Sequence, residues 1–102
     1  MKGNKLETQK SINQWAFETF GKCNSLDTIF ERYVNEVEEL KAEVILRRIN
    51  KIGNELADNL IVLYQVAEFL NIDLLREVNI KMITNRNRKW KLHGDGTGQH
   101  ID

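Results

Sequence analysis

Proline is absent from this chain of 102 residues, and three of its six glycines are clustered near the end. Proline and glycine are the residues that most often interrupt helices, so their scarcity in the interior favours a mostly helical fold. Hydrophobic residues make up 41% of the chain and charged residues 29%, which is an ordinary globular mixture. Because the length matches about one domain, we predict a single small all-α domain.

The charge balance and the single cysteine narrow the possible functions. Fifteen basic residues cancel fifteen acidic ones, which argues against a protein that binds polyanions through bulk charge. Cys23 alone can form neither an internal disulfide nor a cysteine zinc site, so we expect a reducing, cytoplasmic location. Residues 1–10 lack the apolar core of a signal peptide, and the longest apolar run, residues 60–63, is too short to cross a membrane. We therefore expect no membrane association.

Apolar residues recur at helical spacing in four segments. Ser11 and Gln14 form a capping-box pattern that predicts the start of a first helix, which ends at Gly21. The other expected helices span residues 28–47, 54–70 and 74–90. Asp27 or Thr28 is the expected cap of the first of these three. We predict a small four-helix bundle over residues 11–91, a flexible arm at 1–10 and a glycine-rich tail at 92–102.

The third predicted helix is apolar on nearly every side between residues 60 and 70. Such a helix belongs in the middle of a bundle or at a subunit interface. The fourth predicted helix is expected to turn its apolar residues inward: Leu74, Leu75, Val78, Met82 and Ile83. Because a short chain covers few faces of such a helix, we expect at least a two-fold dimer.

Paired acidic residues are the most informative feature of the second and third helices. Glu36 and Glu39 are three residues apart, as are Glu55 and Asp58, so each pair projects from one helix face. If these helices pack antiparallel, the four carboxylates converge, and a hard divalent cation such as Mg²⁺ or Mn²⁺ relieves their repulsion. The alternative is a solvated acidic face paired with nearby basic residues. Glu43 shares the face one turn later, and we favour an ordinary surface glutamate over a spare ligand.

The fourth predicted helix and its end carry six basic residues against the single acidic Glu77. Lys81, Asn85 and Arg88 fall at positions i, i+4 and i+7, so they share one helix face. A lysine, an amide and an arginine on one ridge can hold phosphate oxygens. The alternative is that cations near a helix C-terminus merely complement the helix dipole.

These motifs resemble those of a known family. Asn35-Glu36-Val37-Glu38-Glu39 and Glu55-Leu56-Ala57-Asp58 resemble the EExxE…ExxD signature of the MazG-like, all-α nucleoside triphosphate pyrophosphohydrolases. The spacing of Lys81, Asn85 and Arg88 is similar to the phosphate-contacting helix of that superfamily. The resemblance extends over roughly residues 11–101 and is greatest to the phage and bacterial dATP/dGTP pyrophosphohydrolase branch. Asn35 stands where the family has its first glutamate, which puts a supporting role at that position in doubt.

The resemblance implies hydrolysis of a purine deoxynucleoside triphosphate, dATP or dGTP, to the monophosphate and pyrophosphate. It implies Mg²⁺, with Mn²⁺ as a substitute, bound by four carboxylates: Glu36, Glu39, Glu55 and Asp58. Glu36 and Glu39 are then equal candidates for the general base. Lys81 and Arg88 would neutralise the departing pyrophosphate, and Asn85 would position it. It also favours a homotetramer built from two dimers, in the cytoplasm of a bacterium or a phage-infected host.

Several roles stay open. Trp15 is a candidate for stacking on the base, but it shares a stripe with Ile12 and Phe20, so core packing is favoured. Trp90 either anchors the tail or stacks on the base, and the tail either stays loose or folds over the nucleotide. The competing functions are a pyrimidine-specific enzyme of the dUTPase or dCTPase type, and a helical module that docks nucleic acid or protein through the basic helix. The neutral charge disfavours a stable nucleic-acid partner.

Overall fold

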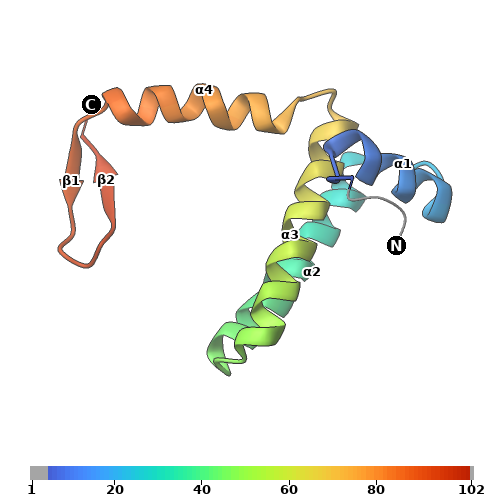
Figure 1. Ribbon diagram of the computed structural model, residues 1–102, viewed down its shortest axis with the longest axis horizontal. Helices are drawn as coiled ribbons and strands as arrows, with labels where there is room; N and C mark the ends of the chain where they lie inside the picture. Colours follow the sequence, from blue (N-terminus) through green and yellow to red (C-terminus); the bar gives the residue numbers. More distant parts are fainter. Residues whose placement is uncertain (1–4, 102) are drawn as a thin grey trace.

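The computed structural model describes residues 5–101 and shows four helices followed by a short β-hairpin (Figure 1). The elements are α1 (Gln9–Phe20), α2 (Leu26–Ile45), α3 (Ile49–Phe69), α4 (Leu74–Asn87), β1 (Trp90–Leu92) and β2 (Gly98–His100). The predicted all-α class with four helices is confirmed, and the hairpin is the one addition among the described residues. None of the helices in this part of the chain is both long and apolar enough to cross a membrane.

Helix α3 is the centre of the helical body, as its apolar sequence predicted. It pairs along its length with α2 and also packs against α1 (Figure 1). The residues buried at these contacts include Ile29 of α2, and Val62 and Ala67 of α3. Because α2 and α3 are joined by a tight turn, they run antiparallel, and the faces that carry the acidic pairs meet.

The first two helices begin earlier than the sequence predicted, α1 by three residues and α2 by two or three. In α1 the cap is Thr8, whose hydroxyl accepts a hydrogen bond from the Ser11 amide at 3.0 Å, while the Ser11 hydroxyl accepts from the Thr8 amide at 2.7 Å. In α2 the cap is Ser25, which accepts from the amide of Thr28 at 3.1 Å. Ser11 and Thr28 therefore occupy the third helical position rather than the cap, and the helical domain begins at Gln9 rather than at residue 11.

The start of α3 differs from its predicted position, whereas the end agrees with it. Its start lies at Ile49, well before the expected residue 54, because the break between α2 and α3 is confined to a turn with Arg47 at a φ of 57°. Its end was predicted correctly. Asn71 adopts a left-handed φ of 56°, and the carboxylate of Asp73 caps α4 by accepting from the Arg76 amide at 3.1 Å.

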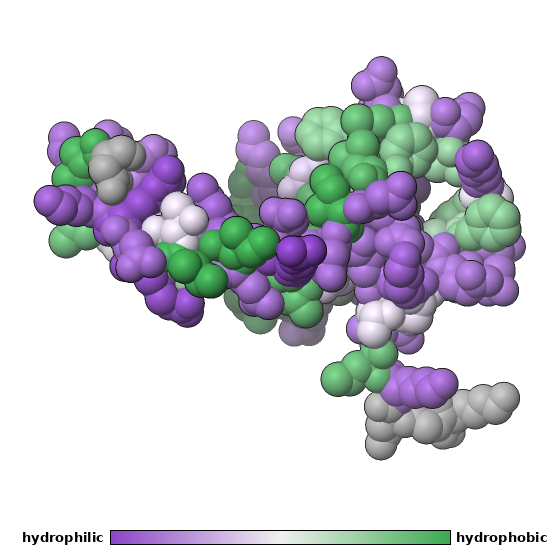
Figure 2. Space-filling model, turned by 90° about the horizontal axis from the view of Figure 1, so that it is seen from above, coloured by the Kyte–Doolittle hydropathy of each residue, from purple (hydrophilic) through white to green (hydrophobic). Residues whose placement is uncertain are grey.

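Helix α4 leaves the body of α1–α3 and extends as a separate arm (Figure 1). The prediction that its apolar residues point into a core is wrong within one chain, because none of the helices described for residues 5–101 lies alongside α4. Leu74, next to the body, is half-buried, but the others are exposed: Leu75, Val78, Met82 and Ile83. Figure 2 shows such hydrophobic patches both along the arm and on the helical body.

The arm ends in a hairpin rather than continuing as a helix to residue 90. Arg88 has extended backbone angles, φ −86° and ψ 157°, so of the predicted phosphate-binding ridge only Lys81 and Asn85 lie within the helix. The glycine-rich tail supplies the hairpin, in which Trp90 pairs with His100 and Leu92 with Gly98. A Cβ at Gly98 would lie 2.6 Å from the carbonyl oxygen of Lys91, so this position requires glycine.

Candidate metal centre

Three acidic side chains converge where α2 faces α3. One carboxylate oxygen from each of Glu36, Glu39 and Glu55 lies within 4.8 Å of the others. Glu36 is buried, Glu55 is half-buried and Glu39 is exposed. Asp58 lies one turn along α3 from Glu55 and lines the cleft beside the cluster. The convergence that the two acidic pairs predicted is present, with three oxygens in one cluster and Asp58 at its edge.

The proximity of these carboxylates perturbs their protonation. Burial raises the pKa of Glu36, and the hydrogen bond and negative charge of Glu39 raise it further, while Arg32 acts in the opposite direction. The pKa of Glu55 is also raised, first by desolvation and then by the negative charges of Glu39, Asp58 and Glu43. Burial, followed by the repulsion between neighbouring carboxylates, thus outweighs the attraction of the Arg32 guanidinium and favours the protonated form of both glutamates.

The cluster contains buried carboxylate oxygens without hydrogen-bond partners. Within residues 5–101, the Oε2 atoms of Glu36, Glu43 and Glu55 are buried and have no hydrogen-bond partner. Leaving a carboxylate oxygen buried and unsatisfied is costly, and such atoms are rare in native proteins. An all-oxygen donor set with excess negative charge suits Mg²⁺ or Mn²⁺, so these residues fit a hard divalent cation.

Asn59 fixes the separation of the two helices behind the carboxylates. Its side chain is buried, and Nδ2 donates hydrogen bonds to the carbonyl oxygens of Glu36 at 3.1 Å and of Glu55 at 2.8 Å. One amide therefore ties the backbones of two cluster residues from different helices. Sequence reasoning missed this residue, although its position four residues after Glu55 places it on the same helix face.

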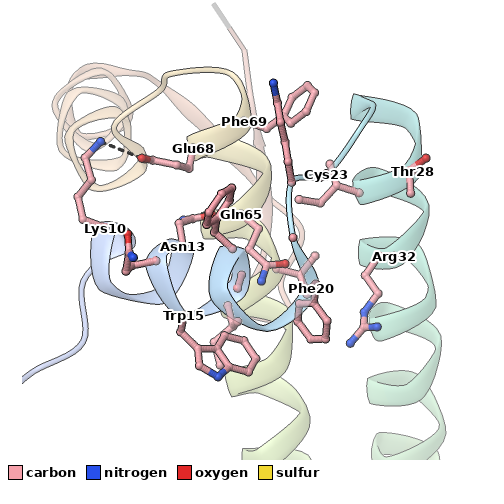
Figure 3. A pocket seen from close by; sticks show the side chains of 18 of the residues that line it. Lys10, Asn13, Trp15, Phe20, Cys23, Thr28, Arg32, Gln65, Glu68 and Phe69 are labelled. Atoms are coloured by element: carbon pink, nitrogen blue, oxygen red, sulfur yellow. Dashed lines mark hydrogen bonds and ion pairs between the residues drawn. The ribbon is translucent and has the colours of Figure 1, made fainter.

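A cleft of about 1140 Å³ opens beside the carboxylates between α1, α2 and α3. Glu36 and Asp58 line it together with Arg32, which pairs with Glu36 at 3.2 Å. Trp15 and Phe20 of α1 form an aromatic wall, their rings edge to face at 5.5 Å (Figure 3). Trp15 is 51% exposed, so the favoured prediction that it packs in the core is wrong. The side chain lies on the wall because α1 covers α3 with its other face.

The predicted phosphate-binding residues lie elsewhere. Lys81, Asn85, Arg88 and Trp90 all belong to the arm and its hairpin, and none of them lines the cleft. The indole Nε1 of Trp90 donates to the carbonyl oxygen of Asn85 at 2.9 Å, and its ring meets that of His100 edge-on at 6.1 Å. Trp90 thus anchors the hairpin to the end of α4. Within one chain the basic arm does not approach the carboxylates.

Two known proteins are similar to this chain, one in sequence and one in structure. No family model matches the chain. Over 99 residues, which are 97% of the chain, it is 32% identical to the dATP/dGTP diphosphohydrolase of Salmonella phage PMBT28, and it spans about a third, 32%, of that protein's length. The solved structure of the cyanophage S-2L MazG-like pyrophosphohydrolase superposes with a TM-score of 0.71 at 23% identity, covering 92% of this chain and 89% of that one. The chain has a MazG-like fold. The predicted resemblance to this superfamily and its phage branch is thereby confirmed.

The structure also corrects the prediction for Glu43. This residue, expected on the surface, is 8% exposed and forms an ion pair with Arg48. Arg32, which the sequence analysis did not single out, pairs with Glu36 and lines the same cleft. The position of Glu43 could have been inferred from its seven-residue separation from Glu36. Seven residues are about two helical turns, so both side chains lie on the same helix face. How deeply α3 covers that face depends on the packing of the two helices and could not be predicted from local sequence.

Proposed function

We propose that this chain is a metal-dependent pyrophosphohydrolase that converts dATP and dGTP to the monophosphate and pyrophosphate. The observation that carries the proposal is the cluster of Glu36, Glu39 and Glu55, with buried unpartnered oxygens, at the edge of a cleft of about 1140 Å³. That volume exceeds the range of about 300–1,000 Å³ usual for small-molecule sites, so a nucleotide fits. The phage relative is named a dATP/dGTP diphosphohydrolase, and the cyanophage structure contains dGDP and three catalytic Mn²⁺ ions per active site.

The proposed ligands of the metal are Glu36, Glu39, Glu55 and Asp58, with Mg²⁺ as the natural ion and Mn²⁺ as a substitute. When bound, such an ion screens the phosphate charge and lowers the pKa of a coordinated water. Asn59 keeps the two helices at the spacing that lets carboxylates from both reach one site. The raised pKa values of Glu36 and Glu55 support this assignment, because they reflect burial and then repulsion between carboxylates, and a bound cation offsets both.

The protein groups around the cleft have separate proposed tasks. Glu36 or Glu39 accepts the proton of the water that attacks the α-phosphorus. A new bond forms between the water oxygen and the α-phosphorus, the bond from the α-phosphorus to the bridging oxygen breaks, and pyrophosphate leaves. Arg32 lies where a guanidinium can bind a phosphate oxygen, and Trp15 presents a ring on which a purine can stack.

The arm completes the site only if chains associate. The chain exposes 8584 Å², whereas a compact monomer of 11.9 kDa exposes about 6,000 Å². Its radius of gyration is 16.6 Å, against about 13 Å for a compact chain of this length. We therefore propose a homotetramer of two dimers, with a dimer as the smallest folded unit. In it, Lys81, Asn85 and Arg88 of one chain contact the phosphates bound at another chain's carboxylates, in the cytoplasm of a bacterial or phage-infected cell.

The test is pyrophosphate release from each deoxynucleoside triphosphate, with and without Mg²⁺, in three variants. Glu39→Ala and Asp58→Ala should each lower the rate ~100-fold or more, as removal of catalytic electrostatics does, while helix content is retained. Glu38→Ala is the matched control, because Glu38 is exposed, neighbours Glu39 and lies outside the cluster. Retained activity in both test variants would overturn the site assignment.

The same assay tests the substrate class. We expect dATP and dGTP to be cleaved faster than dUTP and dCTP, because the large aromatic-walled cleft favours the larger bases. A clear pyrimidine preference would instead assign the chain to a dUTPase-like or dCTPase-like activity.

A further inference from the structure

One side chain from α1 holds the junction at which α4 leaves the helical body. Gln9, the first residue of α1, is half-buried beside the end of α3 and the turn that leads into α4 (Figure 1). Its Oε1 accepts a hydrogen bond from the backbone amide of Leu74 at 3.1 Å. Its Nε2 donates to the carbonyl oxygen of Ile72 at 2.7 Å and to Oε1 of Glu68 at 2.9 Å. We call these three contacts the Gln9 clamp.

The clamp uses the whole amide group of Gln9 in one orientation. Leu74 is the first residue of α4, so its N–H has no acceptor within the helix. The carboxylate of Asp73 caps α4 through the amide of Arg76, which leaves the Leu74 amide to Gln9. A flipped amide would set Nε2 against the Leu74 N–H and its oxygen against two acceptors. All three contacts therefore depend on the observed orientation.

The base of the clamp is attached firmly to α3. Oε2 of Glu68 forms an ion pair with Lys10 at 2.8 Å (Figure 3). The hydrogen bonds from Lys10 and Gln9 hold the pKa of Glu68 below its usual value, so the carboxylate stays a charged acceptor. One turn along α1, Nδ2 of Asn13 donates to the carbonyl oxygen of Tyr64 at 3.1 Å. Helices α1 and α3 thus form one unit, and the clamp connects α4 to it.

Little else connects α4 to the body of its own chain. Within residues 5–101, no other helix packs alongside α4, no ion pair joins it to α1–α3, and its one hydrogen bond to them is that of Leu74 with Gln9. The 14 residues of α4 span about 21 Å at 1.5 Å per residue. A swing of about 20° at the junction would therefore move the far end of α4 by about 7 Å.

We propose that Gln9 is a positioning residue for the arm. The clamp sets the direction in which α4 leaves the body and so places three arm residues at a neighbouring chain's carboxylates: Lys81, Asn85 and Arg88. The inference rests on the proposed function in taking these three residues as phosphate contacts. A charge-assisted hydrogen bond requires a separation of about 2.7–2.9 Å, so a displacement of several ångströms abolishes it. Gln9 does not line the cleft, and it acts through the arm.

The competing explanation is that the clamp only stabilises the junction, while packing against a neighbouring chain sets the direction of the arm. The two explanations differ in what happens to the arm when the clamp is removed. Under the proposal the arm changes direction, whereas under the alternative only the thermal stability falls.

Double electron–electron resonance on the full-length chain measures the direction of the arm. Spin labels are attached to cysteines that replace Lys41 of α2 and Thr84 of α4, both exposed, in a Cys23→Ser background. Labelled chains are mixed with an excess of unlabelled chains before assembly, so that each distance is measured within one chain. With Gln9 present, we expect one narrow distribution of distances.

Gln9→Met removes all three contacts while keeping a side chain of similar length and helix propensity. We expect it to broaden or shift the distribution by several ångströms. Thr19→Met is the matched control, because it places the same side chain at an exposed position of α1 that does not line the cleft, and it should leave the distribution narrow. An equally narrow and unshifted distribution in Gln9→Met would overturn the proposal.

Kinetics connect the arm to the reaction. Gln9→Met should lower kcat/KM for dATP about tenfold or more, the size of a lost hydrogen bond to a charged group, while it binds Mn²⁺ as the wild type does. Gln9→Glu keeps the acceptor for Leu74 but removes both donors, so it should move the arm as well and replaces Gln9→Met if circular dichroism shows that the latter is unfolded. A displaced arm with full activity would contradict the positioning role. A displaced arm in Gln9→Met and a wild type that releases no pyrophosphate would contradict only the proposed function.

Discussion

Replacing Asn59 by leucine tests whether one buried amide holds the metal-binding helices together. The side chain of Asn59 is 8% exposed and donates to the carbonyl oxygens of Glu36 and Glu55, at 3.1 and 2.8 Å. Leucine has a similar volume, so it removes both hydrogen bonds without opening a large cavity. The helix backbone itself can persist, because both carbonyl oxygens lie inside regular helices.

The expected loss of stability follows from these contacts. Each hydrogen bond contributes a net of about 0.5–1.5 kcal/mol, so losing two costs about 2 kcal/mol. Leucine favours the helix over asparagine by at most about 0.7 kcal/mol, which leaves a net loss of roughly 1–2 kcal/mol. In a domain of this size, each kcal/mol lowers Tm by about 4–8 °C. We therefore expect Tm to fall by about 4–16 °C.

Thermal unfolding followed by circular dichroism, at one fixed protein concentration and without metal, measures this change. Asn54→Leu is the matched control, because it makes the same substitution at an exposed position of the same helix. It should leave Tm unchanged or raise it slightly through helix propensity. The reasoning is refuted if Asn59→Leu is as stable as Asn54→Leu.

Three further outcomes are expected. The pKa values of Glu36 and Glu55 are raised in the folded chain, so their contribution to stability is present near their ordinary value of 4.5 and lost as pH rises through the raised values. The Tm advantage of Glu36→Gln over wild type, both without metal, should therefore grow as pH rises above the ordinary value of 4.5, and a constant difference would contradict it. Mixing inactive Asp58→Ala with inactive Lys81→Ala should restore pyrophosphate release if each site draws on two chains, whereas a mixture as inactive as its parts would exclude sharing. Light scattering should give about four times 11.9 kDa, and an active monomer at micromolar concentration would be incompatible with the proposed assembly.

The helices and the carboxylate cluster were predictable from local pattern. A three-residue spacing fixes which helix face an acid occupies, and a tight turn between two helices brings such faces together. That was enough to place Glu36, Glu39 and Glu55 in one cluster. The observed caps of α1 and α2 lie two or three residues before the predicted ones, because Thr8 is as capable of capping as Ser11, and Ser25 as Asp27 or Thr28.

Other features depend on packing that no local pattern encodes. Glu43 and Asn59 are polar residues whose burial is decided by the partner helix rather than by their own neighbours in sequence. For α4, an apolar stripe indicates that some surface covers it but does not say which chain supplies that surface. The same physical ambiguity explains why the basic ridge and the carboxylates, predicted to share a site, lie apart within one chain.

The most direct test of the central claim is phosphorus NMR of the products that the wild-type chain forms from dATP. With Mg²⁺ present, the signals of dATP should be replaced by those of dAMP and pyrophosphate in equal amounts, and without a divalent ion they should persist. Release of orthophosphate with dADP, or of inorganic triphosphate with deoxyadenosine, would contradict cleavage between the α- and β-phosphates. Equal turnover with and without Mg²⁺ would contradict the assignment of the carboxylate cluster as a metal centre.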